Sequence, residues 1–202
     1  MTLYIVIITC ILSIVAFSRT DIMERLILHP YSVQHKNEWY RMVTSGFLHA
    51  DWLHLLINMF VLFSFGGVVN TYYGYVFVSS GNIHFVIMYI TSIFAANVHS
   101  LYKYKDAYQY KSLGASGAVS AVVFASILFQ PLAKIYLYGI IGIPGIVAGI
   151  LYLVYSNYAA KKQNDNINHD AHFYGAVYGI AYTIVFKPAV IKIFMNRLAE
   201  GF

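Results

Sequence analysis

The sequence predicts an all-α membrane protein with six spanning helices, and three observations support this prediction. Charged residues make up 10% of the chain and hydrophobic residues 59%, whereas a soluble domain carries about 25% charged residues. The mean hydropathy is +0.63, which is too high for a soluble protein of this size because its surface needs polar groups. The few charges are also grouped, so that long uncharged windows lie between them.

Five windows contain no Asp, Glu, Lys or Arg, and their lengths are close to or above the roughly 17–25 residues of a membrane span. They are residues 1–18, 52–102, 112–133, 135–160 and 171–186. The second window holds two spans, because the polar, glycine-bearing stretch 70–82 divides it. We therefore predict spans at about 2–17, 52–69, 83–101, 114–130, 135–155 and 171–186. Pro144 is expected to kink the fifth.

The segments around the spans complete a single membrane domain over residues 1–202. The connector at about 18–46 mixes charges with Trp39 and Tyr40, so we expect it to lie at the membrane interface. The tail at about 187–202 is basic. Because the basic residues flank predicted spans, we expect the net charge of +5 to favour the lipid bilayer and not nucleic acid as a partner.

Features of the first span exclude other classes of protein. Cys10 is the lone cysteine, so neither a disulfide framework nor a cysteine zinc site is expected. Residues 1–18 have neither a basic start nor a clear small-residue cleavage site, so we interpret them as a retained span and not a signal peptide.

Polar residues inside apolar spans are costly, and each is therefore a candidate for function. In the second span, His54 and Asn58 are four residues apart and project from one helical face. His49 precedes His54 by five residues, about 140° around a helix, and is expected to point elsewhere. Polar pairs also hold membrane helices together, so for His54 and Asn58 alone a structural role and a functional role are equally good explanations.

The fourth span opens with a serine between small residues, in the run 114–117. Gly114 and Gly117 let the backbone approach closely, and the start of a helix favours an anion or a developing oxyanion near Ser116. Gly117, Ala121 and Ala125 also form a stripe suited to close helix packing. Both interpretations can hold, with Ser116 at the head of the stripe.

The sixth span carries His172, Gly175 and Gly179 on one helical face. The two glycines would let this helix pack against the stripe of the fourth span, carrying His172 toward Ser116. A histidine held there could take the serine proton, which is nucleophilic catalysis by a serine–base pair. Asp170 diverges from His172 by about 200° around a helix. We interpret Asp170 as a loop or first-turn residue at the helix N-terminus, where negative charge is favourable.

The other histidines carry less weight. His29 and His35 lie in the connector and are expected to be solvated. An alternative class is a transporter or metal-handling membrane protein, whose ligands would be His49, His54, His169 and His172. Against it, no carboxylate lies deep in a span and the HExxH pattern is absent. We expect no metal and no cofactor.

Together these motifs resemble those of the rhomboid family of intramembrane serine proteases. The resemblance runs from about Trp39 to Gly179 and depends on the order and spacing of the motifs more than on any one of them. Its parts are W-Y-R at 39–41 with Thr44, H-x4-H-x3-N at 49–58, G-A-S-G at 114–117 and A-H-x2-G-x3-G at 171–179.

The resemblance implies a six-helix rhomboid-like bundle that hydrolyses peptide bonds of transmembrane protein substrates. Ser116 would be the nucleophile and His172 its general base, without a third carboxylate. His54, Asn58 and the backbone N–H of Ser116 would form the oxyanion hole. The residues that would support this site structurally are Gly114, Gly117, Gly175, Gly179, His49 and Arg41. Among these, Arg41 would stabilise the first loop and His49 would help to order that region.

Two features depart from the family pattern. Ser120 stands where some members have a tyrosine that stacks on the base. The distribution of Lys and Arg predicts that the termini lie outside, whereas the family places them in the cytoplasm, and we adopt the family orientation. The expected location is a bacterial inner membrane, as a multi-pass protein. The alternative is a non-catalytic rhomboid-like protein that binds or escorts membrane clients, although such proteins typically lack the serine or the histidine.

Overall fold

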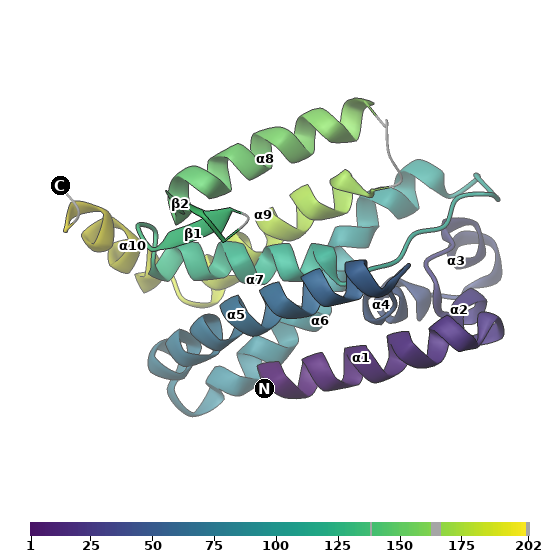
Figure 1. The fold of residues 1–202 in the computed structure, drawn as a ribbon, viewed down its shortest axis with the longest axis horizontal. Coiled ribbons are helices and arrows are strands. Elements are labelled where there is room, and N and C mark those ends of the chain that lie inside the picture. Colours follow the sequence, from purple (N-terminus) through teal and green to yellow (C-terminus); the bar gives the residue numbers. More distant parts are fainter. Residues whose placement is uncertain (138, 163–166, 201–202) are drawn as a thin grey trace.

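The computed structural model describes residues 1–137, 139–162 and 167–200 and confirms that the chain is mostly helical (Figure 1). The helices before Ser116 are α1 (Thr2–Ser18), α2 (Thr20–Leu26), α3 (Pro30–Lys36), α4 (Arg41–Thr44), α5 (Trp52–Phe77) and α6 (Gly81–Tyr104), with 3₁₀ turns η1 (Ser45–Phe47) and η2 (Val78–Ser80). The later elements are α7 (Ser116–Phe129), β1 (Lys134–Leu137), β2 (Ile141–Pro144), α8 (Gly145–Lys162), α9 (His169–Phe186) and α10 (Ala189–Ala199).

Helix α7 forms the centre of the molecule, in contact with α5, α6 and α9 (Figure 1). Twelve of its 14 residues are buried. A sequence rich in Gly, Ala, Ser and Val suits this position, because small side chains let neighbouring helices approach closely. Larger side chains fill the space toward α5 and α6, and Tyr73, Phe85 and Phe129 are fully buried there. The start of α7 is therefore held from several sides.

The second window forms two helices that pack on each other, as predicted, although the break within 70–82 is shorter than expected. Helix α5 continues through Phe77, and only the short turn η2 separates it from α6. The polar residues are accommodated within the helices: Thr71 donates to the carbonyl of Gly67 at 3.0 Å, and the Asn70 amide donates to Asn82 Oδ1 at 3.2 Å. Val78 ends the helix with a φ of 53°, a conformation that an α-helix cannot continue.

The fifth predicted span is wrong in its first half, which is a β-hairpin. Strands β1 and β2 pair antiparallel, with Lys134 opposite Pro144. Isoleucine and tyrosine favour strands, and Gly139 takes a φ of 73° at the turn, where a residue without Cβ is preferred. Pro144 ends the second strand and does not kink a helix. Helix α8 starts only after it and continues to Lys162.

The count of six spans remains a prediction. By length and hydropathy alone, the described residues contain one helical stretch fit to cross a membrane, Trp52–Tyr104. There are two if α9 and α10, which are bent by 112° at their junction, are taken together. Helices α1 and α7 are apolar but have only 17 and 14 residues.

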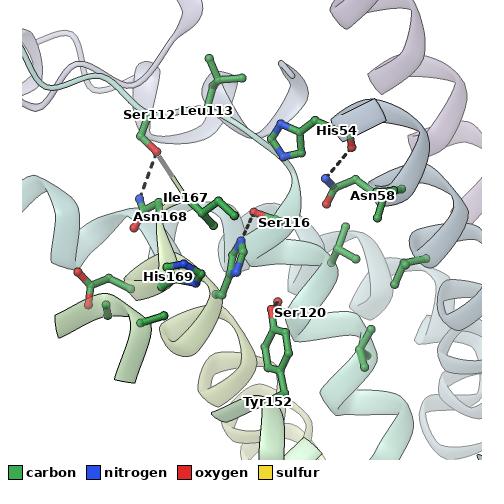
Figure 2. Close-up of a pocket in the computed structure, with 18 of the residues that line it drawn as sticks. His54, Asn58, Ser112, Leu113, Ser116, Ser120, Tyr152, Ile167, Asn168 and His169 are labelled. Atoms are coloured by element: carbon green, nitrogen blue, oxygen red, sulfur yellow. Dashed lines mark hydrogen bonds between the residues drawn. The ribbon is translucent and has the colours of Figure 1, made fainter. Parts of the chain in front are cut away.

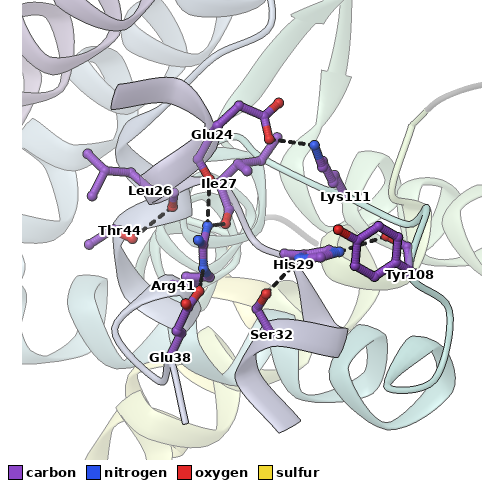
Figure 3. Close-up of polar contacts among 10 residues, drawn as sticks. All are labelled: Glu24, Leu26, Ile27, His29, Ser32, Glu38, Arg41, Thr44, Tyr108 and Lys111. Atoms are coloured by element: carbon purple, nitrogen blue, oxygen red, sulfur yellow. Dashed lines mark hydrogen bonds and ion pairs between the residues drawn. The ribbon is translucent and has the colours of Figure 1, made fainter. Parts of the chain in front are cut away.

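The connector predicted at 18–46 folds into α2, α3, α4 and the start of η1, and Figure 3 shows the polar contacts that hold it. Arg41 is buried and donates from one nitrogen to the carbonyls of Glu24 and Ile27, each at 2.8 Å. It also forms an ion pair with Glu38. Because three segments of the connector meet at one guanidinium, Arg41 fixes their mutual arrangement.

The expectation that His29 is solvated is wrong. Its side chain is buried, with Nδ1 2.8 Å from Ser32 Oγ and Nε2 2.7 Å from the carbonyl oxygen of Tyr108 (Figure 3). His29 therefore links the connector to the loop after α6. His35 is exposed, as expected.

Candidate active site

Ser116 and His172 lie in contact although 56 residues separate them in the sequence. His172 Nε2 is 2.8 Å from Ser116 Oγ. Ser116 is the first residue of α7 and His172 lies in the first turn of α9, so the contact joins the starts of two helices. Both residues are half-buried. This distance is within the range for proton transfer between a hydroxyl and an imidazole.

Glycines bring α9 against α7. A Cβ on Gly175 would overlap the backbone carbonyl of Gly117, and a Cβ on Gly179 would overlap the backbone of Ala121. Helix α7 also lies close to α6, since a Cβ on Gly117 would be 2.6 Å from Ala96 Cβ in α6. The backbones therefore meet directly, as the pattern of small residues in both spans predicts.

The segment before Ser116 is held by backbone hydrogen bonds from the connector. Leu28 and Ser112 exchange two bonds of 3.0 Å each, and Gly114 N–H donates to the Ser45 carbonyl at 3.0 Å. Gly114 has a φ of 127°, which side chains disfavour. A Cβ there would also lie 2.8 Å from His54 Cε1. Gly114 is thus required both by its conformation and by the histidine beside it.

His54 and Asn58 lie in the first two turns of α5, on the side of the serine (Figure 2). His54 Nδ1 accepts a long hydrogen bond of 3.5 Å from Ala50 N–H, so a neutral ring carries its proton on Nε2. That nitrogen would be 3.1 Å from a Cβ on Gly114, so it faces the loop that leads to Ser116. Asn58 is buried, and its amide donates one N–H to the His54 carbonyl at 2.9 Å.

His49 does not point away from His54, contrary to the prediction. It precedes the first turn of α5, so helical spacing does not apply to it, and the two rings lie 4.9 Å apart. His49 is fully buried between Ser13 Oγ at 2.9 Å and the N–H of Ala115 at 3.5 Å. Since Nε2 accepts from Ala115, Nδ1 carries the proton and donates to Ser13, whose hydroxyl donates to the Phe47 carbonyl.

This chain of hydrogen bonds requires a neutral imidazole. Burial, and secondarily the neighbouring His54, lower the pKa of His49 from its ordinary value to about 3. His49 lies outside the spanning stretch Trp52–Tyr104. It joins α1 to the residue just before Ser116, a contact for which the sequence offered no signal beyond the histidine itself.

Asp170 lies in the first turn of α9, as predicted, and its carboxylate faces α6. Its Oδ2 lies 3.2 Å from Lys103 Nζ and 3.4 Å from His99 Nδ1. Among the described residues, no three His, Cys, Asp or Glu side chains are placed to share a metal ion.

Asn168 is a contributor that the sequence analysis missed. It caps α9 by accepting from Ala171 N–H at 3.1 Å. Its amide donates to Ser100 Oγ at 2.9 Å and to Ser112 Oγ at 3.2 Å (Figure 2). An asparagine before a helix is a recognisable capping signal, but its second contact depends on the tertiary fold. Asn168 thus ties the helix of His172 to the loop of Ser116.

A cavity of about 1130 Å³ lies over Ser116 and His172. Its walls come from α5, α7, α8, α9 and the segment 109–113, and they are mainly apolar with polar groups gathered near Ser116 (Figure 2). The end of the polar loop 161–170 borders the cavity from Ile167 onward, and its residues 163–166 lie outside the described residues. A serine hydroxyl in contact with an imidazole, at an apolar cavity with N–H donors beside it, is an arrangement that can support acyl transfer.

Comparisons with known proteins agree on one family. A family model described as the Rhomboid domain matches residues 36–189. Rhomboid-like protein 11, chloroplastic, from Arabidopsis thaliana is 30% identical over 155 residues, covering 70% of this chain and 50% of that protein. RHOMBOID-like protein 12, mitochondrial, from the same plant is 29% identical over 72% of this chain and 46% of that protein.

Two further relatives extend the range of organisms. Rhomboid protein 1, mitochondrial, from Saccharomyces cerevisiae is 30% identical over 78% of this chain and 44% of that protein. A relative from Bacillus subtilis is 28% identical over 68% of this chain and 62% of that protein. The chain thus spans about half the length of the first relatives it matches. Three of the four are organellar by name, so they do not support the expectation of a bacterial inner membrane.

Proposed function

Since this chain belongs to the rhomboid family of membrane-integral proteins, whose members are generally intramembrane serine proteases, we propose that it is itself an intramembrane serine endopeptidase. Its substrates would be proteins with a transmembrane segment, and its reaction the hydrolysis of a peptide bond in that segment. The observation that carries the proposal is the 2.8 Å contact between Ser116 Oγ and His172 Nε2 beside the large cavity.

In the first step, His172 Nε2 accepts the proton of Ser116 as Oγ attacks the scissile carbonyl carbon. The resulting imidazolium then donates that proton to the leaving amine, and an acyl-enzyme remains on Ser116. A water deprotonated by His172 releases the acyl group and restores both residues. Proton transfer of this kind contributes typically about 10²–10⁴-fold to the rate.

The negative charge of the tetrahedral intermediate needs donors beside Ser116. His54 supplies an Nε2–H that faces the Gly114 loop, Asn58 supplies an amide, and the N–H of Ser116 opens helix α7. Preorganised donors of this kind are effective because they pay no reorganisation cost during the reaction. The helix N-terminus adds a favourable dipole.

A fluorophosphonate probe tests the nucleophile without a known substrate. Ser116 Oγ would attack phosphorus, fluoride would leave, and His172 would take the proton. We expect the wild-type protein in membranes to be labelled, and the Ser116→Ala and His172→Ala variants to insert normally without being labelled.

The matched control is Ser64→Ala, which removes an exposed serine of α5 that hydrogen bonds only within its own helix in the described structure. It should be labelled like the wild type. Equal labelling of Ser116→Ala and wild type would overturn the proposal. Absence of labelling in the wild type would favour the non-catalytic, client-binding alternative.

A further inference from the structure

Helix α8 contributes one aromatic side chain to the surroundings of His172. The ring of Tyr152 and the imidazole of His172 are nearly parallel, with an interplanar angle of 20° and centroids 6.3 Å apart. This geometry is within the range of offset-stacked rings. Tyr152 is half-buried and lines the cavity. The imidazole thus has a hydroxyl at its edge, from Ser116, and an aromatic ring over its face.

The position of the Tyr152 ring is fixed from helix α7. Tyr152 Oη and Ser120 Oγ are 2.7 Å apart (Figure 2). Ser120 is buried and lies one helical turn after Ser116, on the same side of α7. A single side chain of α8 therefore contacts the nucleophile helix through its hydroxyl and the base through its ring.

Helix α8 packs on α9 and more lightly on α7, and Tyr152 and Leu153 lie against a small apolar cluster. Its buried residues are Gly145, Gly149 and Ser156, whereas many of its large apolar side chains are exposed. Figure 1 shows α8 at the margin of the bundle. The hydrogen bond from Tyr152 to Ser120 is thus a specific connection between a peripheral helix and the site.

We infer that Tyr152 is a positioning residue for His172, holding the imidazole against Ser116 through its ring while Ser120 holds the ring through its hydroxyl. The inference rests on the proposed function, since it gives His172 the role of base. It also explains how a chain with serine at position 120 supports its base: the aromatic ring is supplied by α8 and not by α7.

The test measures the rate of labelling by a small alkyl fluorophosphonate, separated into the maximal inactivation rate and the probe concentration at half-maximal rate. Tyr152→Leu should lower the maximal rate about 10-fold, the equivalent of a lost aromatic contact near the upper end of its usual range. The half-maximal concentration should stay within twofold. Tyr152→Phe keeps the ring and should lose no more than about threefold.

Ser120→Ala should match Tyr152→Phe, and the double variant should be no slower than either single one, because both changes break the same hydrogen bond. The decisive variant is Tyr152→Leu combined with Ser120→Tyr. It returns an aromatic ring from α7 to the space beside His172 and should recover most of the lost rate. A purely structural role for Tyr152 would not predict this recovery.

Tyr158→Leu is the matched control, since Tyr158 lies on α8 but is exposed and contacts Lys162. It should be labelled like the wild type. The inference is overturned if Tyr152→Leu is labelled at the wild-type rate, or if Tyr152→Phe is as slow as Tyr152→Leu. Thermal unfolding of each variant identifies any that fails to fold. If Tyr152→Leu fails to fold, a loss of more than about threefold in the labelling rate of Tyr152→Phe or Ser120→Ala overturns the inference. Failure of the wild type to be labelled would instead refute the proposed function.

Discussion

A single methyl group at Gly175 should disable the site while leaving the protein folded. Gly175 lies one turn after His172 on α9, where the backbone of α7 is closest. A Cβ built there would be 2.7 Å from the carbonyl carbon of Gly117 and closer still to its oxygen, whereas ordinary contact begins near 3.4 Å. Backbone cannot rotate away as a flexible side chain can, so the helices must separate by about 1 Å.

The consequence for the reaction follows from this separation. The distance between His172 Nε2 and Ser116 Oγ is now 2.8 Å. An increase of about 1 Å would take it beyond hydrogen-bonding range. Displacement of a reacting group by this amount costs about 10²-fold in rate. The cost in stability is smaller, because overpacking by about 1–3 kcal/mol is partly offset by the gain of about 1 kcal/mol when alanine replaces glycine in a helix.

The assay compares fluorophosphonate labelling with thermal unfolding in the same detergent. Gly175→Ala should be labelled about 10²-fold more slowly than the wild type and unfold within a few degrees of it. Gly67→Ala is the control, since a Cβ on Gly67 of α5 would meet nothing within 4 Å. It should keep the wild-type labelling rate and gain slight stability. Labelling of Gly175→Ala within twofold of wild type would refute the reasoning.

Three further predictions concern other residues of the site. Asp170→Asn should leave the hydrolysis rate within about threefold of wild type, because the carboxylate faces Lys103; a loss as large as that of His172→Ala would show that it acts on the base. Asn58→Ala should slow peptide hydrolysis by about 10²-fold without abolishing it, since one oxyanion donor is lost, and wild-type turnover would exclude that role. Because the pKa of His49 is lowered to about 3, its contribution to stability should be complete above pH 6.5 and be lost as the pH falls toward 3. Unfolding measured against pH should show this loss in the wild type and a weaker one in His49→Gln.

The pattern of small residues allowed the close packing of α7 against α9 to be predicted from the sequence. Gly117 and Ala121 recur at helical spacing in one span and Gly175 and Gly179 in another. Such spacing carries three-dimensional information, because each small residue marks a place where another backbone can approach. Local rules were therefore sufficient to bring the starts of α7 and α9 together.

The β-hairpin could not be predicted in the same way. Residues 135–160 carry no charge, and an uncharged run does not distinguish a helix from apolar strands. Isoleucines beside Gly139, Gly142 and Pro144 indicated strands and a turn, but the length of the uncharged window favoured a spanning helix. The burial of His29 in the connector was likewise not predicted, because it depends on Tyr108, which lies 79 residues away.

Tyr152 illustrates a further limit. Its partner Ser120 is 32 residues away on another helix, and neither residue belongs to a motif. The absence of an aromatic residue at position 120 was visible in the sequence, but the element that supplies one instead depends on how α8 packs. Compensation between helices is a property of the tertiary structure.

The shortness of the central helix determines how deep the reaction would lie. At 1.5 Å per residue, the 14 residues of α7 extend over about 21 Å, and the hydrocarbon core of a bilayer is about 30 Å thick. If the end at Phe129 reaches one edge of the core, Ser116 lies about 9 Å beneath the opposite edge. A scissile bond would have to meet the serine at that depth, where a substrate helix still has its carbonyls hydrogen-bonded within the chain. The preferred substrates should therefore be those whose membrane segment unwinds easily about two turns from its end. Helix stability in the substrate would then contribute to selection, together with the side chains at the cleavage point.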